Sequence, residues 1–224
     1  LFALRGYLDG LEQGIAQSPE KIAKYIAVCK EKSAQLDRLV EDLFTFTKMD
    51  YFETQLNNKT MDFAHILQES INSLTPQARE KHISLSTDFT HNCFISGDRH
   101  LLERAMNNIL ENAVRHTPSG GEIDVHCHRD DQYVRFTIRD SGAGFSMEEL
   151  TRVFEPLYRG EASRSRSTGG SGLGLTISHR IMKQHGGEME ASNHPQGGAV
   201  LAGWLPVAGS NPKVKEANSE ISDN

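Results

Sequence analysis

An apolar residue at every seventh position restricts the fold of the first fifty residues more than any other feature of the sequence. A seven-residue apolar period indicates a helix with one long apolar seam that packs lengthwise against another helix. Ser18 and Pro19 precede the repeat and supply the N-cap and the first-turn proline with which a helix starts. The residues that carry the repeat are Ile22, Cys29, Leu36 and Leu43.

The segment before this helix carries a second apolar seam, with the alternating three- and four-residue spacing of a helix. Its residues are Leu1, Leu4, Leu8, Leu11 and Ile15. Two such seams joined by a short turn predict an antiparallel helical hairpin over residues 1–52. Because two helices alone cannot cover both seams, we expect pairing with a second copy in a dimeric four-helix bundle. The alternative is that the hairpin packs on the remainder of the same chain.

A polar linker, residues 53–60, separates the hairpin from a segment in which helical and strand patterns alternate. Asp62 and Asp98 are placed to act as N-caps for two helices, because aspartate at that position accepts hydrogen bonds from the first free backbone N–H groups. The expected helices run over about 63–74, 99–115, 147–154 and 173–185. The expected strands are 83–89, 122–128, 133–140, 189–192 and 199–206.

This order of helices and antiparallel strands predicts an α+β fold in which residues 61–207 form an α/β sandwich with its helices on one face. The polar tail, residues 208–224, lacks apolar anchors, and we expect it to be disordered. The net charge is -6, from 24 Lys and Arg against 30 Asp and Glu. The chain therefore has no general attraction for nucleic acid. No run of about 18 apolar residues is present to span a membrane.

Asn108, Asn112 and Arg115 share one face of the helix predicted after Asp98, through i, i+4 and i, i+3 spacing. The two side-chain amides offer oxygen to a hard divalent cation such as Mg²⁺, which proteins often share with nucleotide phosphates. Arg115 adds positive charge for a phosphate. The alternative is an ordinary polar face on a helix whose apolar side is buried.

Two glycine-rich segments follow. Asp140–Gly144 comes directly after a predicted strand, where a carboxylate can accept a hydrogen bond from an exocyclic amine such as that of adenine. Gly142 and Gly144 let the backbone approach a flat ring. Gly169–Leu175 leads into a helix, and backbone N–H groups in such a loop suit a polyphosphate, although the run matches neither Walker A nor the dinucleotide fingerprint. The alternatives are a tight turn and a flexible loop.

Between these two segments lies Phe154–Arg159, followed by a polar, glycine-bounded stretch over residues 160–168. The stretch contains Arg164 and Arg166. We interpret it as a mobile lid whose arginines reach a phosphate tail. The alternative is an ordinary surface loop with solvated arginines.

In their order and spacing, these four segments resemble the N, G1, F and G2 boxes of sensor histidine kinases, whose ATP-binding fold is shared with Hsp90, type II topoisomerases and MutL. Leu1–Tyr7 is similar to the sequence that follows the H-box of these kinases, and Asp37–Leu43 to their second dimerisation helix. The Hsp90 and topoisomerase relatives carry no such hairpin, so the combination favours a histidine kinase. The resemblance extends to Pro206.

The resemblance implies roles for individual residues. Asn112, with Asn108 beside it, would hold Mg²⁺, and Asp140 would accept a hydrogen bond from the adenine amine. The residues implied in catalysis are Asn112, Arg115 and Arg159. The implied nucleotide-binding residues are Asn108, Asn112, Arg115, His116, Asp140, Gly142, Gly144, Tyr158, Arg164, Gly170, Gly172, Leu173 and Gly174.

The resemblance also implies a function. The protein would bind ATP and Mg²⁺ and, in its intact form, transfer the γ-phosphate to a histidine and then to an aspartate of a response regulator receiver domain. It would act as a homodimer joined through the hairpin. The phosphoacceptor histidine of the family and its acidic neighbour precede the motif that begins here at Leu1. We therefore expect the chain to be part of the cytoplasmic domain of a bacterial cell-membrane receptor.

Two other functions stay open on the sequence. The first is an ATPase of the Hsp90 or MutL type, which would hydrolyse ATP without the upstream segment. The second is a non-catalytic module that binds nucleotide and only regulates a partner. The presence of Asn112, Asp140 and the glycines of the loop argues against a decayed site.

Overall fold

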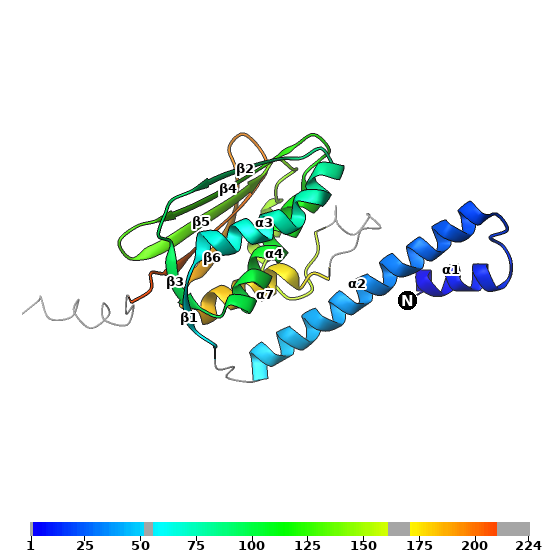
Figure 1. The fold of residues 1–224 in the computed structure, drawn as a ribbon, viewed down its shortest axis with the longest axis horizontal. Coiled ribbons are helices and arrows are strands. Elements are labelled where there is room, and N and C mark those ends of the chain that lie inside the picture. Colours follow the sequence, from blue (N-terminus) through cyan, green and yellow to red (C-terminus); the bar gives the residue numbers. More distant parts are fainter. Residues whose placement is uncertain (1, 52–55, 161–170, 210–224) are drawn as a thin grey trace, which may run out of the picture.

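The computed structural model describes residues 2–51, 56–160 and 171–209. They form a helical hairpin and an α/β domain, with the longer helix of the hairpin lying along one side of the domain (Figure 1). The helices are α1 (Phe2–Glu12), α2 (Pro19–Tyr51), α3 (Phe63–Glu80), α4 (Arg99–His116), α5 (Met147–Arg152) and α7 (Gly174–Gln184). The strands are β1 (Lys59–Asp62), β2 (Ser84–Phe89), β3 (Phe94–Gly97), β4 (Glu122–Arg129), β5 (Tyr133–Asp140), β6 (Glu188–Asn193) and β7 (Ala199–Pro206).

The predicted helical hairpin is present. Ser18 accepts a hydrogen bond from the backbone N of Lys21 at 3.3 Å, and α2 begins at the residue after Ser18. α1 packs on α2 through Tyr7 and Tyr25, whose rings meet edge to face with centroids 5.0 Å apart. Gly10 allows this approach, because a Cβ there would lie 2.9 Å from the ring of Tyr25.

The seam of α1 is shorter than predicted. The helix ends at Glu12, and Gly14 follows with a φ of 67°. Glycine adopts this left-handed conformation without strain, and it commonly ends a helix. Ile15 therefore leaves the helix and is 59% exposed. The expectation that Ile15 continues the seam is wrong, because the apolar spacing runs past the backbone signal that stops the helix.

Much of the apolar seam of α2 stays exposed, although α1 packs on its N-terminal half and α7 on its C-terminal half. The C-terminal half of α2 packs on α7, and Phe46 is partly buried against the core of the α/β domain. The large apolar residues of α2 that remain exposed are Ile22, Ile26, Leu36, Leu39, Val40, Leu43 and Phe44. The hairpin thus packs on the remainder of the chain and still presents an apolar stripe.

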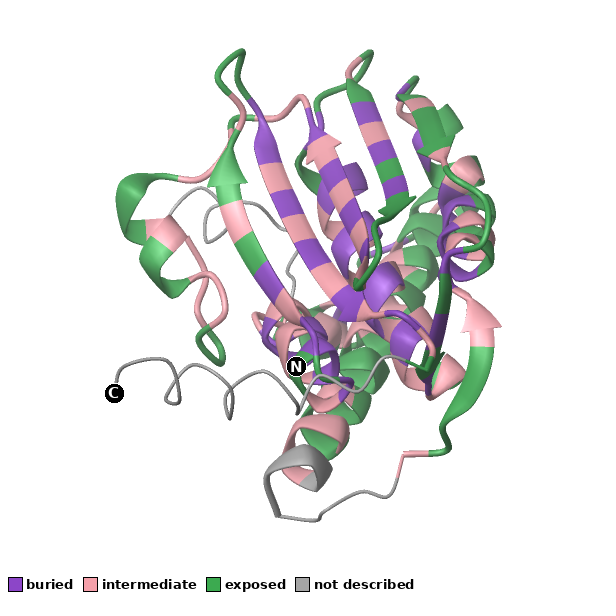
Figure 2. Ribbon diagram, turned by 90° about the vertical axis from the view of Figure 1, so that its left-hand side faces the viewer, coloured by how far each residue is buried: buried purple, intermediate pink, exposed green. Residues whose placement is uncertain are grey.

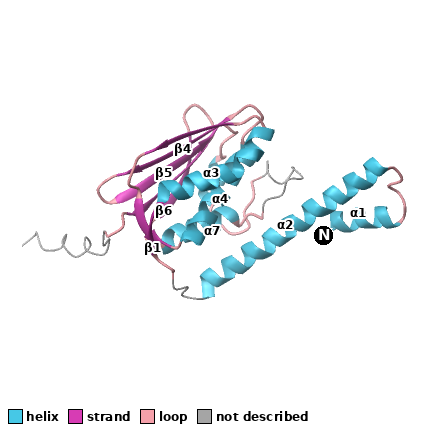
Figure 3. Ribbon diagram, viewed as in Figure 1, coloured by secondary structure: helices cyan, strands magenta, loops and turns pink. Residues whose placement is uncertain are grey.

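The α/β domain contains a five-stranded sheet in the order β2-β4-β5-β7-β6 and a two-stranded ribbon of β1 and β3. Helices α3, α4 and α7 cover one face of the large sheet (Figures 1 and 3). Buried residues alternate with less buried ones along β5 and β7 (Figure 2), as expected for a sheet with one packed face. The predicted α+β sandwich is confirmed.

The predicted caps position the helices of this layer. Asp62 accepts a hydrogen bond from the backbone N of Ala64 at 3.1 Å, at the start of α3. Asp98 accepts two, from His100 N at 3.1 Å and Leu101 N at 3.3 Å, at the start of α4. Because α4 carries candidate site residues, its cap at Asp98 sets where they stand along the sheet.

Two features of the sheet differ from the prediction. β2 pairs with β4 in parallel, whereas antiparallel strands were expected. The reason is α4, which returns the chain across the sheet face so that both strands run in the same direction. β1 and β3 were not predicted at all. Each has four residues, and they pair with each other in a small ribbon, so neither shows a long enough alternation to be recognised.

Candidate functional site

A cavity of about 1470 Å³ opens where α2, α4, the start of α7 and the loop after β5 meet. The predicted site residues that line it are Asn108, Asn112, Arg115, His116, Asp140, Gly142, Gly144, Tyr158, Arg159, Gly172 and Gly174. Leu173 points elsewhere, with its side chain buried in the core. Arg164, Arg166 and Gly170 lie outside the described residues. The fold therefore gathers residues from all four segments into one cavity.

α4 presents Asn108 and Asn112 to the cavity because the opposite side of the helix is buried under the sheet. The Asn108 Nδ2 donates to the carbonyl oxygen of Gly174 at 3.2 Å, which ties α4 to the first turn of α7. Within the described parts of the chain, Asn112 makes no side-chain hydrogen bond, so its amide is available to a ligand.

The donor set of the cavity fits a metal ion that is shared with a ligand. Among the described residues, no group of three or more His, Cys, Asp or Glu side chains is placed to hold a metal. The amides of Asn108 and Asn112 are hard, neutral oxygen donors. Mg²⁺ typically takes one or two ligands from a protein and the others from phosphate and water. These residues therefore fit Mg²⁺ that arrives with a nucleotide.

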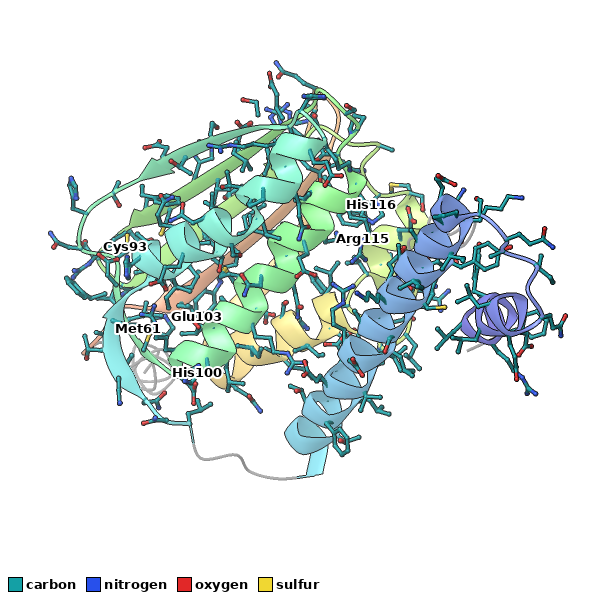
Figure 4. All side chains as sticks on the ribbon, turned by 45° about the vertical axis from the view of Figure 1, so that its right-hand side comes forward. Met61, Cys93, His100, Glu103, Arg115 and His116 are labelled. Carbon is teal, nitrogen blue, oxygen red and sulfur yellow. The ribbon has the colours of Figure 1, made fainter. Side chains whose placement is uncertain are left out.

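The last turn of α4 is held by a residue that sequence analysis missed. The Lys81 Nζ donates to the carbonyl oxygens of Val114 at 2.6 Å, Arg115 at 3.2 Å and Thr117 at 2.8 Å. The last carbonyls of a helix lack intrahelical partners, and a cation there also interacts favourably with the helix dipole. Lys81 thereby orients the turn that carries Arg115 and His116, which lie at the C-terminal end of α4 (Figure 4) and line the cavity.

Asp140 stands at the end of β5 in the cavity wall and is 5% exposed. Its Oδ1 accepts hydrogen bonds from the backbone N of Gly142 at 2.8 Å and of Ala199 at 3.3 Å. Burial raises the pKa of Asp140, and the two backbone hydrogen bonds oppose that shift because they favour the carboxylate. Both bonds use Oδ1, which leaves Oδ2 to accept a hydrogen bond from a ligand amine.

The loop after β5 depends on Asn193, which the sequence did not single out. The Asn193 Nδ2 donates to the carbonyl oxygen of Phe145 at 2.7 Å, and Phe145 N donates to the Asn193 Oδ1 at 2.8 Å. Gly144, just before, has a φ of 73°. Gly198 comes closest to the site carboxylate, because a Cβ there would lie 1.8 Å from the carbonyl oxygen of Asp140. Only glycine permits this approach.

Nearly all of the predicted lid, residues 160–168, lies outside the described residues, but Leu157 and Gly172, which flank it in the chain, are in contact. Leu157 N donates to the carbonyl oxygen of Gly172 at 3.0 Å. Gly172 has a φ of 73°, and a Cβ there would lie 2.9 Å from backbone atoms of Leu157 and Tyr158. Phe154 stacks on His179 of α7 with ring centroids 4.5 Å apart. The segment before residue 160 is therefore anchored on α7, and glycine is required at position 172.

Positive charge gathers at one end of the cavity, where Arg115 and Arg159 are joined by Arg38 from α2. Much of the Arg115 side chain is exposed by surface area, but the cavity walls crowd its charged group. This burial is the main reason why the pKa of Arg115 is lowered; Glu111 opposes the shift, and the charges of Arg38 and Arg159 add to it. Converging cations in a cavity suit an anionic ligand.

Residues 97–209 match the family of histidine kinase-, DNA gyrase B- and HSP90-like ATPases. The matched residues include α4, the loop after β5 and the described part of the glycine-rich segment Gly169–Leu175. The chain belongs to this ATPase family. Its cavity lies within the matched region except for the wall that α2 and Lys81 contribute.

Relatives of this ATPase domain are sensor kinases. The chain is 32% identical over 208 residues to the signal transduction histidine-protein kinase BaeS of Escherichia coli (strain K12). The match covers 92% of this chain and 44% of BaeS. The chain is also 29% identical over 203 residues to the sensor protein SrrB of Staphylococcus aureus (strain N315), with 91% and 35% covered. The chain thus spans less than half the length of these relatives. The resemblance to sensor histidine kinases is confirmed.

Solved structures share the fold of both parts of the chain. The histidine kinase AdeS of Acinetobacter baumannii superposes with a TM-score of 0.75 at 21% identity, over 92% of this chain and 93% of that one. Histidine kinase ThkA, in complex with the response regulator protein TrrA, gives 0.71 at 20% identity, over 91% and 58%. In the present chain, none of the described helices is long and apolar enough to cross a lipid bilayer.

Proposed function

We propose that this chain binds Mg-ATP in the cavity and forms the catalytic region of a sensor histidine kinase. The observation that carries the proposal is the convergence, in one cavity, of a buried carboxylate, two amides, a glycine-bounded helix start and several arginines. The relatives BaeS, named as a histidine-protein kinase, and SrrB, named as a sensor protein, support the proposal. So does ShkA, solved in complex with AMPPNP, which superposes with a TM-score of 0.71 at 24% identity over 87% of this chain and 41% of that one.

The geometry divides the work between the two ends of the cavity. At one end, the Asp140 Oδ2 would accept a hydrogen bond from the exocyclic amine of adenine. At the other, the start of α7, which lines the cavity, would direct backbone N–H groups and the positive end of its dipole toward the phosphates. Asn112 would hold Mg²⁺, which neutralises charge on the phosphate oxygens. Phosphoryl transfer depends mainly on such positioning and charge neutralisation.

We propose further that the γ-phosphate passes to a histidine and then to an aspartate of a response regulator, in a homodimer joined through the hairpin. The structure of ThkA with the response regulator TrrA supports the choice of partner. The exposed apolar residues of α2 outside the cavity, with Ile22, Ile26 and Leu43 among them, support the dimer, because a second copy would remove this apolar surface from water. We also propose that the chain is part of the cytoplasmic domain of a membrane receptor, because BaeS and SrrB are named as signal-transduction and sensor proteins.

Calorimetric titration of the chain with ATP, with and without Mg²⁺, tests the binding site. Asp140→Asn should weaken ATP binding about tenfold or more and reduce the preference for ATP over GTP, because the amide places a donor where an acceptor is needed. Asp131→Asn, in an exposed turn, is the matched control and should bind like the unaltered chain. Equal ATP affinity in both variants would overturn the assignment of Asp140.

Labelled ATP distinguishes kinase from ATPase. A chain extended to include the H-box should retain label from the γ-phosphate in an acid-labile, alkali-stable form, as expected for phosphohistidine. Steady release of inorganic phosphate by the present chain, with no retained label in the extended one, would instead support the Hsp90- or MutL-type ATPase. ATP binding with neither outcome would support the regulatory module.

A further inference from the structure

Helix α2 of the hairpin supplies one wall of the nucleotide cavity. Arg38 lines the cavity together with Gln35, Leu39 and Asp42 of the same helix. Gln35 and Asp42 stand three and four residues from Arg38, so they share its side of the helix, and Leu39 borders that side. The wall lies outside the region that matches the ATPase family, which begins at residue 97. The family's own nucleotide boxes therefore do not account for it.

Asp42 fixes this wall against the glycine-rich segment Gly169–Leu175, through Ser171. One carboxylate oxygen of Asp42 accepts from the Arg104 Nη2 of α4 at 2.9 Å, and the other accepts from the Ser171 Oγ at 2.8 Å. The Asp42 side chain is only 17% exposed, so solvent screens these contacts less than it would on an open surface. One carboxylate thus joins α2 to both α4 and the loop that precedes α7.

A second contact, outside the cavity, holds the same helix. The Arg180 guanidinium of α7 lies over the ring of Phe46, 4.0 Å from its centroid, in the geometry of a cation–π interaction. Phe46 is partly buried against the domain core, whereas its neighbour Phe44 is 65% exposed. Phe46 can therefore be changed to loosen α2 without altering a cavity residue.

The docked helix brings Arg38 to the end of the cavity that already holds Arg115 and Arg159. Glu41 and Glu111 line the cavity as well. Within the described parts of the chain, however, no carboxylate lies within ion-pair distance of Arg38 or Arg115. The guanidinium groups of Arg38 and Arg115 therefore repel each other until an anion lies between them.

We propose that Arg38 is a binding residue for the phosphate tail of the nucleotide, and that α2 must be docked for it to act. A guanidinium presents a planar fork of donors that matches phosphate oxygens. The inference rests on the proposed function, because it takes ATP as the ligand. It adds that the hairpin contributes to nucleotide affinity, so that nucleotide binding and the docking of α2 strengthen each other to the same extent.

Titration calorimetry with ATP, ADP and adenosine tests the contact. Arg38→Gln should raise the Kd of Mg-ATP about tenfold, that of ADP less, and that of adenosine not at all. Lys24→Gln is the matched control, because it removes one positive charge from an exposed position of the same helix away from the cavity. Equal ATP affinity in the two variants, or an equal loss for adenosine, would overturn the proposal.

A double-variant comparison tests the docking. Phe46→Ala should weaken ATP binding about as much as Arg38→Gln, and the double variant should be no weaker than either, because both remove the same contact. Phe44→Ala should have no effect. Additive losses from the two changes would refute the dependence on docking. An unaltered chain that binds no ATP would refute the proposed function together with this inference, whereas binding that Arg38→Gln leaves intact refutes the role of Arg38 alone.

Discussion

Removal of the Lys81 ammonium tests how the end of α4 is built. Lys81→Met keeps the length of the side chain and removes its three donors. Two of the hydrogen bonds, to Val114 at 2.6 Å and Thr117 at 2.8 Å, involve residues that are 5% and 1% exposed. The third, to Arg115 at 3.2 Å, is longer and exposed. The two shorter bonds therefore determine most of the effect.

The expected loss follows from these contacts. Each short bond from a charged donor contributes about 1 kcal/mol in this partly exposed setting. The interaction with the helix dipole adds roughly 0.5 kcal/mol. Together they predict a loss of about 2.5 kcal/mol in the free energy of unfolding, or about 5–10 °C in Tm for a domain of this size. Mg-ATP affinity should fall as well, because Arg115 and His116 stand on the turn that Lys81 holds.

Thermal unfolding by calorimetry, with ATP titration at a temperature where both proteins are folded, measures the two effects. Lys59→Met, at an exposed position of β1, is the matched control and should change Tm by less than about 2 °C. Lys81→Arg should recover part of the loss because it keeps a charged donor. A Tm for Lys81→Met that equals that of the control would refute this account of α4.

Three further predictions concern the site and its supports. Asn112→Ala should remove the dependence of ATP affinity on Mg²⁺, measured by titration at fixed ATP; retained dependence would count against Asn112 as the metal ligand. Gly172→Ala should lower the free energy of unfolding by about 1–3 kcal/mol, because Gly172 has a positive φ and backbone atoms lie close to it. Gly174→Ala is the control and should cost less than about 0.5 kcal/mol, because the nearest atom to an added Cβ would be 3.6 Å away. Equal denaturation midpoints for the two variants would contradict this distinction. Burial lowers the pKa of His185 below its ordinary value, so its contribution to stability is present at neutral pH and is lost as pH falls below about 6.5. The pH dependence of unfolding between pH 7 and 5 should flatten in His185→Gln, and an unchanged slope would exclude this origin.

His185 also shows why some structural residues escape prediction. Its Nε2 accepts from the backbone N of Asp98 at 2.9 Å, and its Nδ1 lies 2.7 Å from the carbonyl oxygen of Ile181. The ring thus links the end of α7 to the cap of α4 and must stay neutral to accept from Asp98. A histidine at the end of a helical pattern carries no sign of such a role, because its partner is 87 residues away.

Much of the site was accessible from sequence because its parts are local. Asn112 follows Asn108 by one helical turn, so their common face follows from helix geometry alone. Asp140 ends β5, and the glycines beside it permit a close approach by a ligand. Leu173 shows the limit of this local information, because its side chain does not line the cavity. It stands inside the glycine run but points into the core, and a run of sequence letters does not show the direction of each side chain.

Residue patterns along the sequence therefore determined the helices, their caps, most strands and the order of the four segments that resemble the N, G1, F and G2 boxes. Periodicity and capping depend on residues only a few positions apart. Only the tertiary structure decided which distant groups complete the site. Lys81 reaches the end of α4, Asn193 holds the loop after β5, and Arg38 enters the cavity from the hairpin. Each of these contacts joins elements far apart in the chain. Their formation depends on how the packed layers bring the elements together, and no short-range pattern records that.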